Sequence, residues 1–137
     1  MRAVQLTTYG DPVEGLKYVD IPAPDAPGPN QVLIGVEFSP INPNDLSVAR
    51  GTYAFRPPLP AVIGNEGVGR ILAVGQGVTS VKVGDRVLAP LSSFTWRERM
   101  VISAGGLSTL PPDADPQQLA APSIPRPRRC CSANMSP

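Results

Sequence analysis

The stretch between residues 59 and 88, in which glycines interrupt two apolar runs, constrains the fold of this chain most. The stretch reads LPAVIGNEGVGRILAVGQGVTSVKVGDRVL, and its two apolar runs are Val68–Val74 and Val81–Leu88. The second run opens Val-Lys-Val, a two-residue period that suits a half-buried strand better than a helix. Its glycines stand where a small β-barrel needs tight turns, bulges or close backbone approach. We therefore predict that both runs are strands and form the spine of an antiparallel β domain.

Further strands are expected on both sides of this spine. Arg2–Leu6 and Lys17–Ile21 are short strand candidates that a Gly-Asp-Pro turn separates, and they can pair as a hairpin. Gln31–Phe38 alternates apolar and other residues most clearly of all. Trp96–Ile102 is the last expected strand. The fold class predicted from these patterns is mostly β.

One short helix is predicted between the strands. Asn42 can cap it, Pro43 fits its first position, and Gly51 can close it after Leu46–Arg50. The segment that follows, Thr52–Pro60, contains three prolines and is expected to form an irregular loop with two exposed aromatic residues.

Composition excludes several classes of function. The chain has 137 residues with 18 prolines and 13 glycines, which argues for one turn-rich domain and against a helical bundle. A net charge of +1 predicts no general attraction to nucleic acid or to an acidic membrane. The N-terminal sequence has no signal-peptide core, and no cysteine precedes Cys130, so a cytoplasmic location is expected.

The spine also carries a family resemblance. GNEGVGRILAVGQGVTSVKVGDRV, with INPNDL before it and TWRERMVI after it, resembles the N-terminal GroES-like domain of the medium-chain dehydrogenase/reductase family. The resemblance covers roughly Met1 to Ala120 and is greatest to the zinc-free quinone oxidoreductases and mitochondrial-type 2-enoyl thioester reductases. It implies a partly open, GroES-like β-barrel with one or two short helices. It also implies that the family's nucleotide-binding Rossmann domain is absent here.

The end of the chain departs from this resemblance. Asp115, Pro116 and Gln118 can begin a helix, but the prolines that follow would abort it, since an interior proline costs about 3 kcal/mol. APSIPRPRRCCSANMSP has no helix or strand period, which is also typical of a disordered tail. From G/C-rich codons another frame can encode PAPAALLLSEYV, which resembles the family's continuation. We therefore hypothesise a frameshift near Ile124, or a sequencing error that mimics one, with domains 1–120 (GroES-like) and 121–137 (out-of-frame tail).

A zinc site is not expected. By resemblance, Asn42 and Asn65 stand where zinc-dependent members keep a cysteine and a histidine ligand. Amides are poor zinc ligands, the chain has no histidine, and Glu66 alone cannot hold the ion. The adjacent Cys130 and Cys131 lack the spacing of a metal site.

A nucleotide site is not expected either. Gly67-Val68-Gly69 lacks the third glycine of a dinucleotide-binding fingerprint and leads into a strand-like run instead of a helix. These glycines are interpreted as turn and bulge positions. The resemblance implies NADPH as the cofactor of full-length family members, bound by the missing nucleotide-binding domain.

Tyr53 is the candidate catalytic residue. A phenol is protonated at neutral pH and can donate a hydrogen bond or a proton to a developing enolate. In the enoyl thioester reductases that the chain resembles, a tyrosine in the matching segment has this role. The alternative is an ordinary surface tyrosine in a proline-rich loop.

Five other residues are weaker candidates for the substrate cleft. Asn42 and Asn44 can instead cap the short helix, Asn65 and Glu66 can bond backbone at a tight turn, and Trp96 can anchor the core.

The resemblance implies a substrate-side domain of an NAD(P)H-dependent reductase. Its expected substrates are 2-enoyl thioesters, with quinones as the next choice, and family members are often homodimeric. The isolated chain is expected to be nearly inactive. The other hypotheses are a free-standing β-barrel that acts as a binding module, and a truncated product without function.

Overall fold

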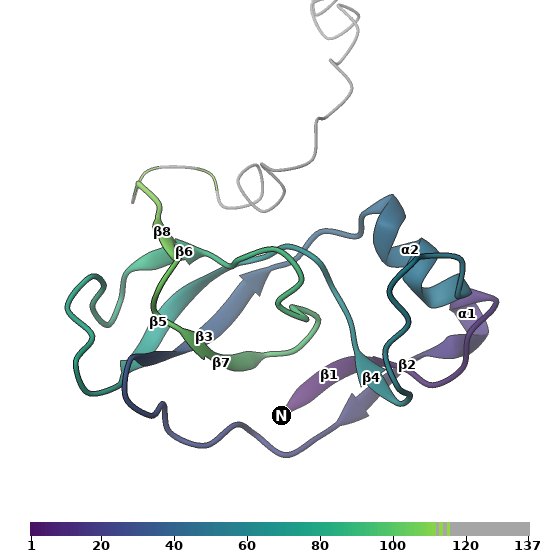
Figure 1. Cartoon of the computed structure of the whole chain (residues 1–137), viewed down its shortest axis with the longest axis horizontal. Coiled ribbons are helices and arrows are strands. Elements are labelled where there is room, and N and C mark those ends of the chain that lie inside the picture. The colour runs from purple at the N-terminus through teal and green to yellow at the C-terminus, as the bar shows by residue number, and fades with distance from the viewer. Residues whose placement is uncertain (112, 114, 116–137) are drawn as a thin grey trace, which may run out of the picture.

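The described part of the chain forms two open β-sheets and two short helices (Figure 1). The computed structural model describes residues 1–111, 113 and 115. The helices are α1 (Pro12–Gly15) and α2 (Pro43–Arg50). The strands are β1 (Arg2–Leu6), β2 (Leu16–Asp20), β3 (Gln31–Phe38), β4 (Ala61–Val62), β5 (Val68–Val74), β6 (Arg86–Leu88), β7 (Arg99–Ser103) and β8 (Ser108–Thr109).

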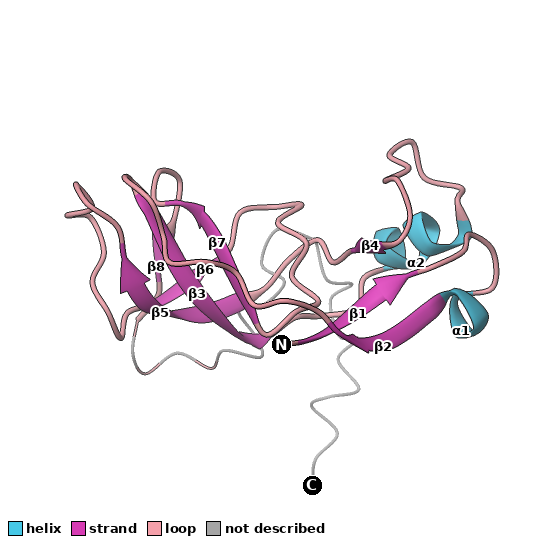
Figure 2. Ribbon diagram, turned by 90° about the horizontal axis from the view of Figure 1, so that it is seen from below, coloured by secondary structure: helices cyan, strands magenta, loops and turns pink. Residues whose placement is uncertain are grey.

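The two sheets have linear strand orders, β2-β1-β4 and β7-β3-β5-β6-β8, so neither closes on itself. Every pairing between the described strands is antiparallel. Figure 2 shows the larger sheet at one end and the smaller sheet with both helices at the other. This arrangement is the mostly β, partly open fold that the sequence predicts.

The two sheets are joined by the segment that leads into β7. Ala3 of β1 forms an isolated antiparallel bridge with Arg97. The Val4 amide donates to the Trp96 carbonyl at 2.9 Å, and the Glu98 amide donates to the Arg2 carbonyl at 3.1 Å. The chain therefore passes from one sheet to the other within a few residues.

Most of the predicted strands are confirmed. β3 has the predicted bounds, and β1 pairs with β2 in a register that sets Arg2 opposite Asp20. The predicted turn between them contains α1, whose N-cap Asp11 accepts a hydrogen bond from the Val13 amide at 3.0 Å. β7 begins at Arg99, later than predicted, because Trp96 donates its amide to the Ile63 carbonyl instead.

The predicted strand over Val81–Leu88 is wrong for its first half. β6 covers only Arg86–Leu88, and the Val-Lys-Val alternation belongs to a turn. In this turn the Asp85 carboxylate accepts the Lys82 amide at 3.0 Å, and Gly84 has a φ of 93°. The alternation arises because Val81 is buried in the core while Val83 is 59% exposed.

Two apolar clusters form the core. One lies within the larger sheet and contains Val32, Ile34, Ile71, Val87 and Met100 among its buried members. The other lies under α2 and contains Leu6, Val48, Ala49 and Ile63. The second cluster packs α2 onto the smaller sheet, and this packing fixes the helix beside the Ile63–Asn65 segment.

The predicted helix is confirmed, with the predicted cap and first residue. α2 starts at Pro43, directly after its N-cap Asn42. It ends at Gly51, which has a left-handed φ of 76° and donates its amide to the carbonyls of Ser47 and Val48. Glycine is favoured there because an L side chain at this φ is strained.

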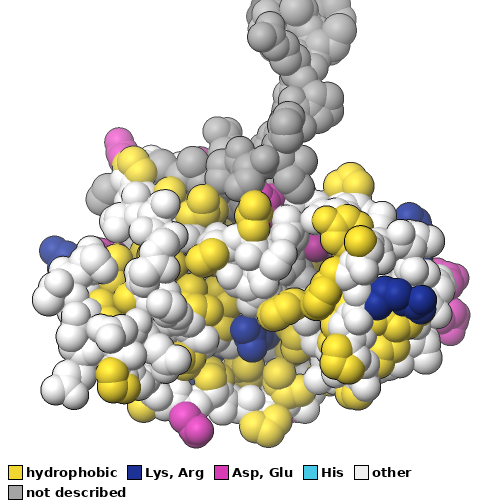
Figure 3. All heavy atoms as spheres, viewed as in Figure 1, with side chains coloured by type: hydrophobic (Ala, Val, Ile, Leu, Met, Phe, Trp, Pro, Cys, Tyr) yellow, Lys and Arg dark blue, Asp and Glu magenta, His cyan; other side chains and the backbone are white. Residues whose placement is uncertain are grey.

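Charged side chains are sparse on the face shown in Figure 3, where apolar side chains gather over the middle. No helix among the described residues combines the length and the apolar character needed to cross a bilayer. The expected helix from Pro116 and the predicted tail at 121–137 lie outside the described residues.

Candidate functional site

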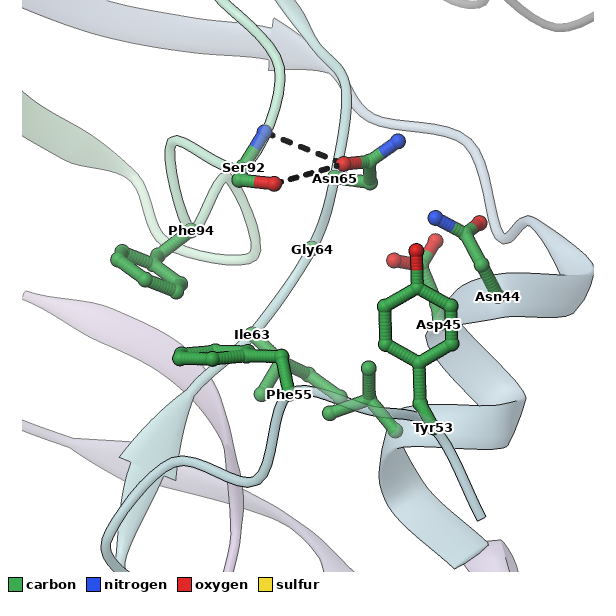
Figure 4. Close-up of a pocket in the computed structure, with 10 residues that line it drawn as sticks. Asn44, Asp45, Tyr53, Phe55, Ile63, Gly64, Asn65, Ser92 and Phe94 are labelled. Atoms are coloured by element: carbon green, nitrogen blue, oxygen red, sulfur yellow. Dashed lines mark hydrogen bonds between the residues drawn. The ribbon is translucent and has the colours of Figure 1, made fainter. Parts of the chain in front are cut away.

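A pocket of about 350 Å³ lies between α2, the 52–60 loop, the Ile63–Asn65 segment and the 92–94 loop. Its size is at the lower end of the range for small-molecule sites. Figure 4 shows the residues that line it. The four segments come from distant parts of the sequence, and α2 is held among them by its buried face, which includes Val48 and Ala49.

Tyr53 lines this pocket and is 44% exposed. Its hydroxyl is directed toward the end of the pocket where Asn44 and Asp45 lie (Figure 4). The loop that carries it is held by Tyr9, whose hydroxyl donates to the Pro57 carbonyl. The Arg56 guanidinium also lies over the Tyr9 ring, 4.5 Å from its centroid. These contacts fix the loop on which the phenol is presented.

A buried acidic pair lies behind the polar end of the pocket. Asp45 is 3% exposed and Glu66 is 1% exposed. The Asp45 carboxylate accepts the Asn42 amide at 2.9 Å, and the Asn42 side chain donates to Glu66 Oε2 at 2.9 Å. Glu66 Oε1 has no hydrogen-bond partner among the described residues. Asp45 therefore lines the pocket, whereas Asn42 and Glu66, both candidates for the cleft, bond to each other and do not line it.

Burial raises the pKa of the Asp45 carboxyl, because removal from water disfavours its charged form. The negative charge of Glu66 raises this pKa further, whereas hydrogen bonds from the backbone amides of Asn42 and Asn65 lower it. From the sequence, Asp45 is expected to cap α2, with a cleft-lining position as the alternative. Its place in the pocket depends on the packing of α2, which no local pattern reveals.

The opposite end of the pocket is aromatic. The rings of Phe55 and Phe94 lie with centroids 6.2 Å apart and planes tilted by 32°. Phe94 belongs to a loop in which Ser92 and Phe94 have left-handed φ values of 60° and 59°. From the sequence, Phe55 is expected only as an exposed loop residue, and no pattern points to Phe94.

Asn65 connects this loop to the pocket floor. Its Oδ1 accepts hydrogen bonds from the Ser92 amide at 3.1 Å and from the Ser92 hydroxyl at 3.2 Å. Its backbone carbonyl also accepts from the Ser92 amide at 2.8 Å. The structure therefore brings Asn44, Asn65 and Tyr53 together in one pocket.

Trp96 lies elsewhere, which corrects the expectation that it shares the cleft. It lines a separate apolar depression of about 360 Å³ with Val4, Leu16 and Ile41 among its neighbours. Its indole Nε1–H donates to the Pro40 carbonyl at 3.4 Å. A Cβ added to Gly64 would lie 2.6 Å from the Trp96 ring, so the indole packs directly against the backbone of the pocket floor.

The residues at the family's zinc-ligand positions do not fit a zinc ion. The Asn42 side chain is bonded to Glu66 and the Asn65 side chain to Ser92. The chain has no histidine. Within the described residues, no group of three or more His, Cys, Asp or Glu could hold a metal ion.

The glycines that resemble a nucleotide fingerprint serve strand packing. Gly69 belongs to β5, and a Cβ there would lie 2.4 Å from the Gly35 carbonyl oxygen of β3. The β3–β5 register shifts nearby, between Val36 and Phe38. A dinucleotide site needs such glycines at a turn into a helix, so this segment does not fit one.

Comparison of sequences gives a family match and named relatives. Residues 28–107 match the family model of the alcohol dehydrogenase GroES-like domain. A mitochondrial enoyl-(acyl-carrier-protein) reductase of Bos taurus is 42% identical over 124 residues, which are 88% of this chain and 32% of that protein. The enzyme of the same name from Caenorhabditis elegans is 44% identical over 91 residues, 66% of this chain and 26% of that protein. The chain thus spans about a third of the length of such relatives.

Solved structures of oxidoreductases also match this fold. A quinone oxidoreductase of Pseudomonas syringae pv. Tomato DC3000 matches with a TM-score of 0.71 and 37% identity, over 87% of this chain and 36% of that chain. The Escherichia coli quinone oxidoreductase complexed with NADPH matches with a TM-score of 0.76 and 29% identity, over 89% of this chain and 37% of that chain.

Proposed function

Because this chain belongs to the alcohol dehydrogenase GroES-like domain family, we propose that it is the substrate-side domain of a zinc-free, NADPH-dependent reductase of 2-enoyl thioesters. The observation that carries the proposal is the Tyr53 phenol in a pocket with one polar and one aromatic end. The relatives named as enoyl reductases support this choice of substrate.

The composition of the pocket supports a neutral substrate group. None of the residues that line it is lysine or arginine, and Asp45 brings a carboxyl group to its polar end. An anionic group would find no cation there to offset its desolvation. A conjugated thioester is neutral and largely apolar at its reacting end, and it can fill the space between Tyr53 and the phenylalanines.

In the proposed reaction Tyr53 acts on the carbonyl side of the double bond. A nicotinamide cofactor bound by another domain would supply hydride chemistry at the β-carbon. The π electrons of the double bond would then move onto the thioester carbonyl, which becomes an enolate. The Tyr53 hydroxyl donates a hydrogen bond to the enolate oxygen or a proton to the α-carbon. Donors aimed at developing negative charge are a large source of rate enhancement. The described residues provide no nicotinamide site of their own, so we propose that another domain carries the cofactor and that the isolated chain is inactive.

Quinone reduction is the second candidate function. Solved structures that this chain resembles are titled quinone oxidoreductases. In that reaction the Tyr53 hydroxyl would donate to a quinone oxygen as it gains negative charge. A quinone is therefore tested as a substrate beside the enoyl thioesters.

The domain boundaries and the location are also proposals. We keep residues 1–120 as the GroES-like domain and 121–137 as an out-of-frame tail. Sequencing the gene across codons 120–140 and beyond tests this division, because nucleotides that cannot encode the alternative frame contradict it. The absence of any downstream frame for a nucleotide-binding domain would favour a free-standing binding module.

Relatives are named mitochondrial, whereas the cytoplasmic location stays a prediction.

The proposed function is tested on the longer polypeptide that the gene encodes when the alternative frame is read from near Ile124 onward. Oxidation of NADPH is followed with trans-2-enoyl thioesters and with a quinone, for the wild type and for Tyr53→Phe. Loss of the phenol hydroxyl should lower kcat with enoyl thioesters by about 10²–10⁴-fold, the usual contribution of a positioned proton donor. The KM should change little, because the ring remains.

Tyr18→Phe is the matched control, since Tyr18 is 68% exposed on β2 and does not line the pocket. Its kcat should equal that of the wild type. Turnover by Tyr53→Phe at the wild-type rate would remove the proposed role of the phenol. Turnover of the quinone alone would favour the second candidate.

A further inference from the structure

The two ends of the pocket impose a direction on any substrate that reacts at Tyr53. The phenol hydroxyl points to the end that holds Asn44 and Asp45, while Phe55 and Phe94 face each other at the other end (Figure 4). A carbonyl that accepts a hydrogen bond from Tyr53 leaves the rest of the molecule to extend toward the two rings. This direction rests on the proposed function.

The spacing of the two rings decides what they can bind. Their centroids are 6.2 Å apart. A planar ring sandwiched between them would need about 3.5–4 Å on each side, hence a centroid separation of about 7–8 Å. The pair is therefore too close to stack a quinone between its members. Its two side chains instead form one continuous apolar wall, along which an aliphatic chain can lie.

The position of this wall depends on a strained loop. Left-handed φ values are unfavourable for residues other than glycine, and strain of this kind gathers at functional sites. Ser92 and Phe94 both adopt such values. The Asn65 side chain holds the loop through two hydrogen bonds from Ser92. Without these side-chain bonds only the 2.8 Å backbone bond from the Ser92 amide to the Asn65 carbonyl would join the two residues, so the loop would relax in part and move the Phe94 ring.

We propose that Phe55 and Phe94 form the acyl-chain subsite of this enzyme, and that Asn65 is a positioning residue that places Phe94 in it through Ser92. The substrate class that follows is a 2-enoyl group with an aliphatic tail beyond the double bond. The tail, and not the reacting carbonyl, is what these three residues discriminate.

The proposal is tested by ligand binding to the 137-residue chain. The probes are trans-2-enoyl amides of four, six and eight carbons, measured by isothermal titration calorimetry. An amide replaces the thioester so that Cys130 and Cys131 do not add to the double bond. For the wild type, the Kd should fall about two- to fourfold with each added methylene, the usual gain from burying one.

Phe55→Ala and Phe94→Ala should reduce this gain to less than about 1.5-fold per methylene, since an exposed methylene gains little. The four-carbon probe, which has a single carbon beyond its double bond, should bind as tightly as before. Asn65→Ala should behave like Phe94→Ala. Asn65→Asp keeps an oxygen that accepts from Ser92 and should restore the dependence on chain length. Leu91→Ala is the control, because Leu91 is 56% exposed in the same region and does not line the pocket.

The outcomes separate this inference from the proposed function. Phe94→Leu, which retains an apolar side chain, should keep part of the dependence and guards against a folding defect in the alanine variant. If the phenylalanine variants keep the full dependence on chain length, the subsite is refuted while the role of Tyr53 stands. If the wild type binds none of the three probes, the pocket is not an enoyl site and both proposals fall.

Discussion

Asp45 is a carboxylate almost completely removed from water, and none of the ion pairs formed among the described residues reaches it. Backbone amides of Asn42 and Asn65 partly replace its lost hydration. Its neighbour Glu66 adds charge of the same sign. A group in this position makes the stability of the domain depend on pH.

The direction of that dependence follows from the raised pKa of Asp45. A carboxyl that holds its proton more tightly in the folded chain stabilises the fold fully below its unfolded pKa of about 3.9, and this contribution is lost as pH rises through the folded value. Asp45→Asn has no proton to lose. The free energy of unfolding is measured in urea at several pH values from 4 to 7. That of Asp45→Asn should increase relative to that of the wild type as pH rises.

Glu14→Gln provides the control, since Glu14 is exposed in α1. Its unfolding free energy should follow the wild type at each pH. A constant difference between Asp45→Asn and the wild type would show that burial of this carboxyl has no such effect.

Single residues were the part of the site hardest to predict from sequence. Tyr53 could be identified because it belongs to a linear segment with a family resemblance. Phe94 could not, because its place depends on a left-handed backbone and on a hydrogen bond from Ser92 to Asn65. For Trp96 the sequence leaves open a core anchor or a cleft contact, and the structure has it packed against the cluster under α2 with its indole against the backbone of Gly64.

At the scale of elements, apolar periodicity predicts a strand correctly where the alternating burial of its residues arises from a sheet alone. β3 alternates because it is paired on both sides within one sheet and covers one core cluster. α2 could be located from its ends, since cap residues and the closing Gly51 act locally. The Val-Lys-Val run failed because a turn can also bury one valine and expose the next. Alternation over three residues is too short to distinguish the two.

The pairing of β3 with β5 requires glycine at position 69. A Cβ there would lie 2.4 Å from the Gly35 carbonyl oxygen and 2.6 Å from a methyl group of Ile34. Gly69→Ala should therefore lower the free energy of unfolding by about 2–3 kcal/mol, as overpacking does in other cores. Urea denaturation of the chain measures this loss.

Gly105→Ala is the comparison variant, because its added Cβ would meet only the Ser103 hydroxyl oxygen at 3.7 Å. This is an ordinary contact, so its unfolding free energy should stay within about 0.5 kcal/mol of the wild type. Equal losses in the two variants would mean that strand approach is not what limits position 69.

At the scale of the whole molecule, the described residues form a pocket with one polar and one aromatic end, which Tyr53 lines. The glycines at 67 and 69 are used in and beside β5. Family resemblance predicted the fold class, which the structure confirms, whereas the division between a substrate-side and a nucleotide-binding domain stays a prediction. The order of the strands within each sheet could not be read from local patterns, because it depends on contacts distant in sequence.

We predict that the 137-residue chain neither binds nor oxidises NADPH. Titration of the chain with NADPH, followed by calorimetry, should give no saturable heat. The Escherichia coli quinone oxidoreductase, whose structure holds NADPH, serves as the positive control. Saturable binding to the chain, or consumption of NADPH with an enoyl thioester, would contradict the prediction.

The bridge between Ala3 and Arg97 has a consequence for biosynthesis. The first strand to leave the ribosome must wait for one of its neighbours until nearly a hundred residues have followed it, about 5–20 s at the usual rates of translation. Until Ala61 and Val62 of β4 have been made, Leu6 has only β2 beside it. The nascent chain is therefore exposed to chaperones and proteases for longer than its size alone would suggest.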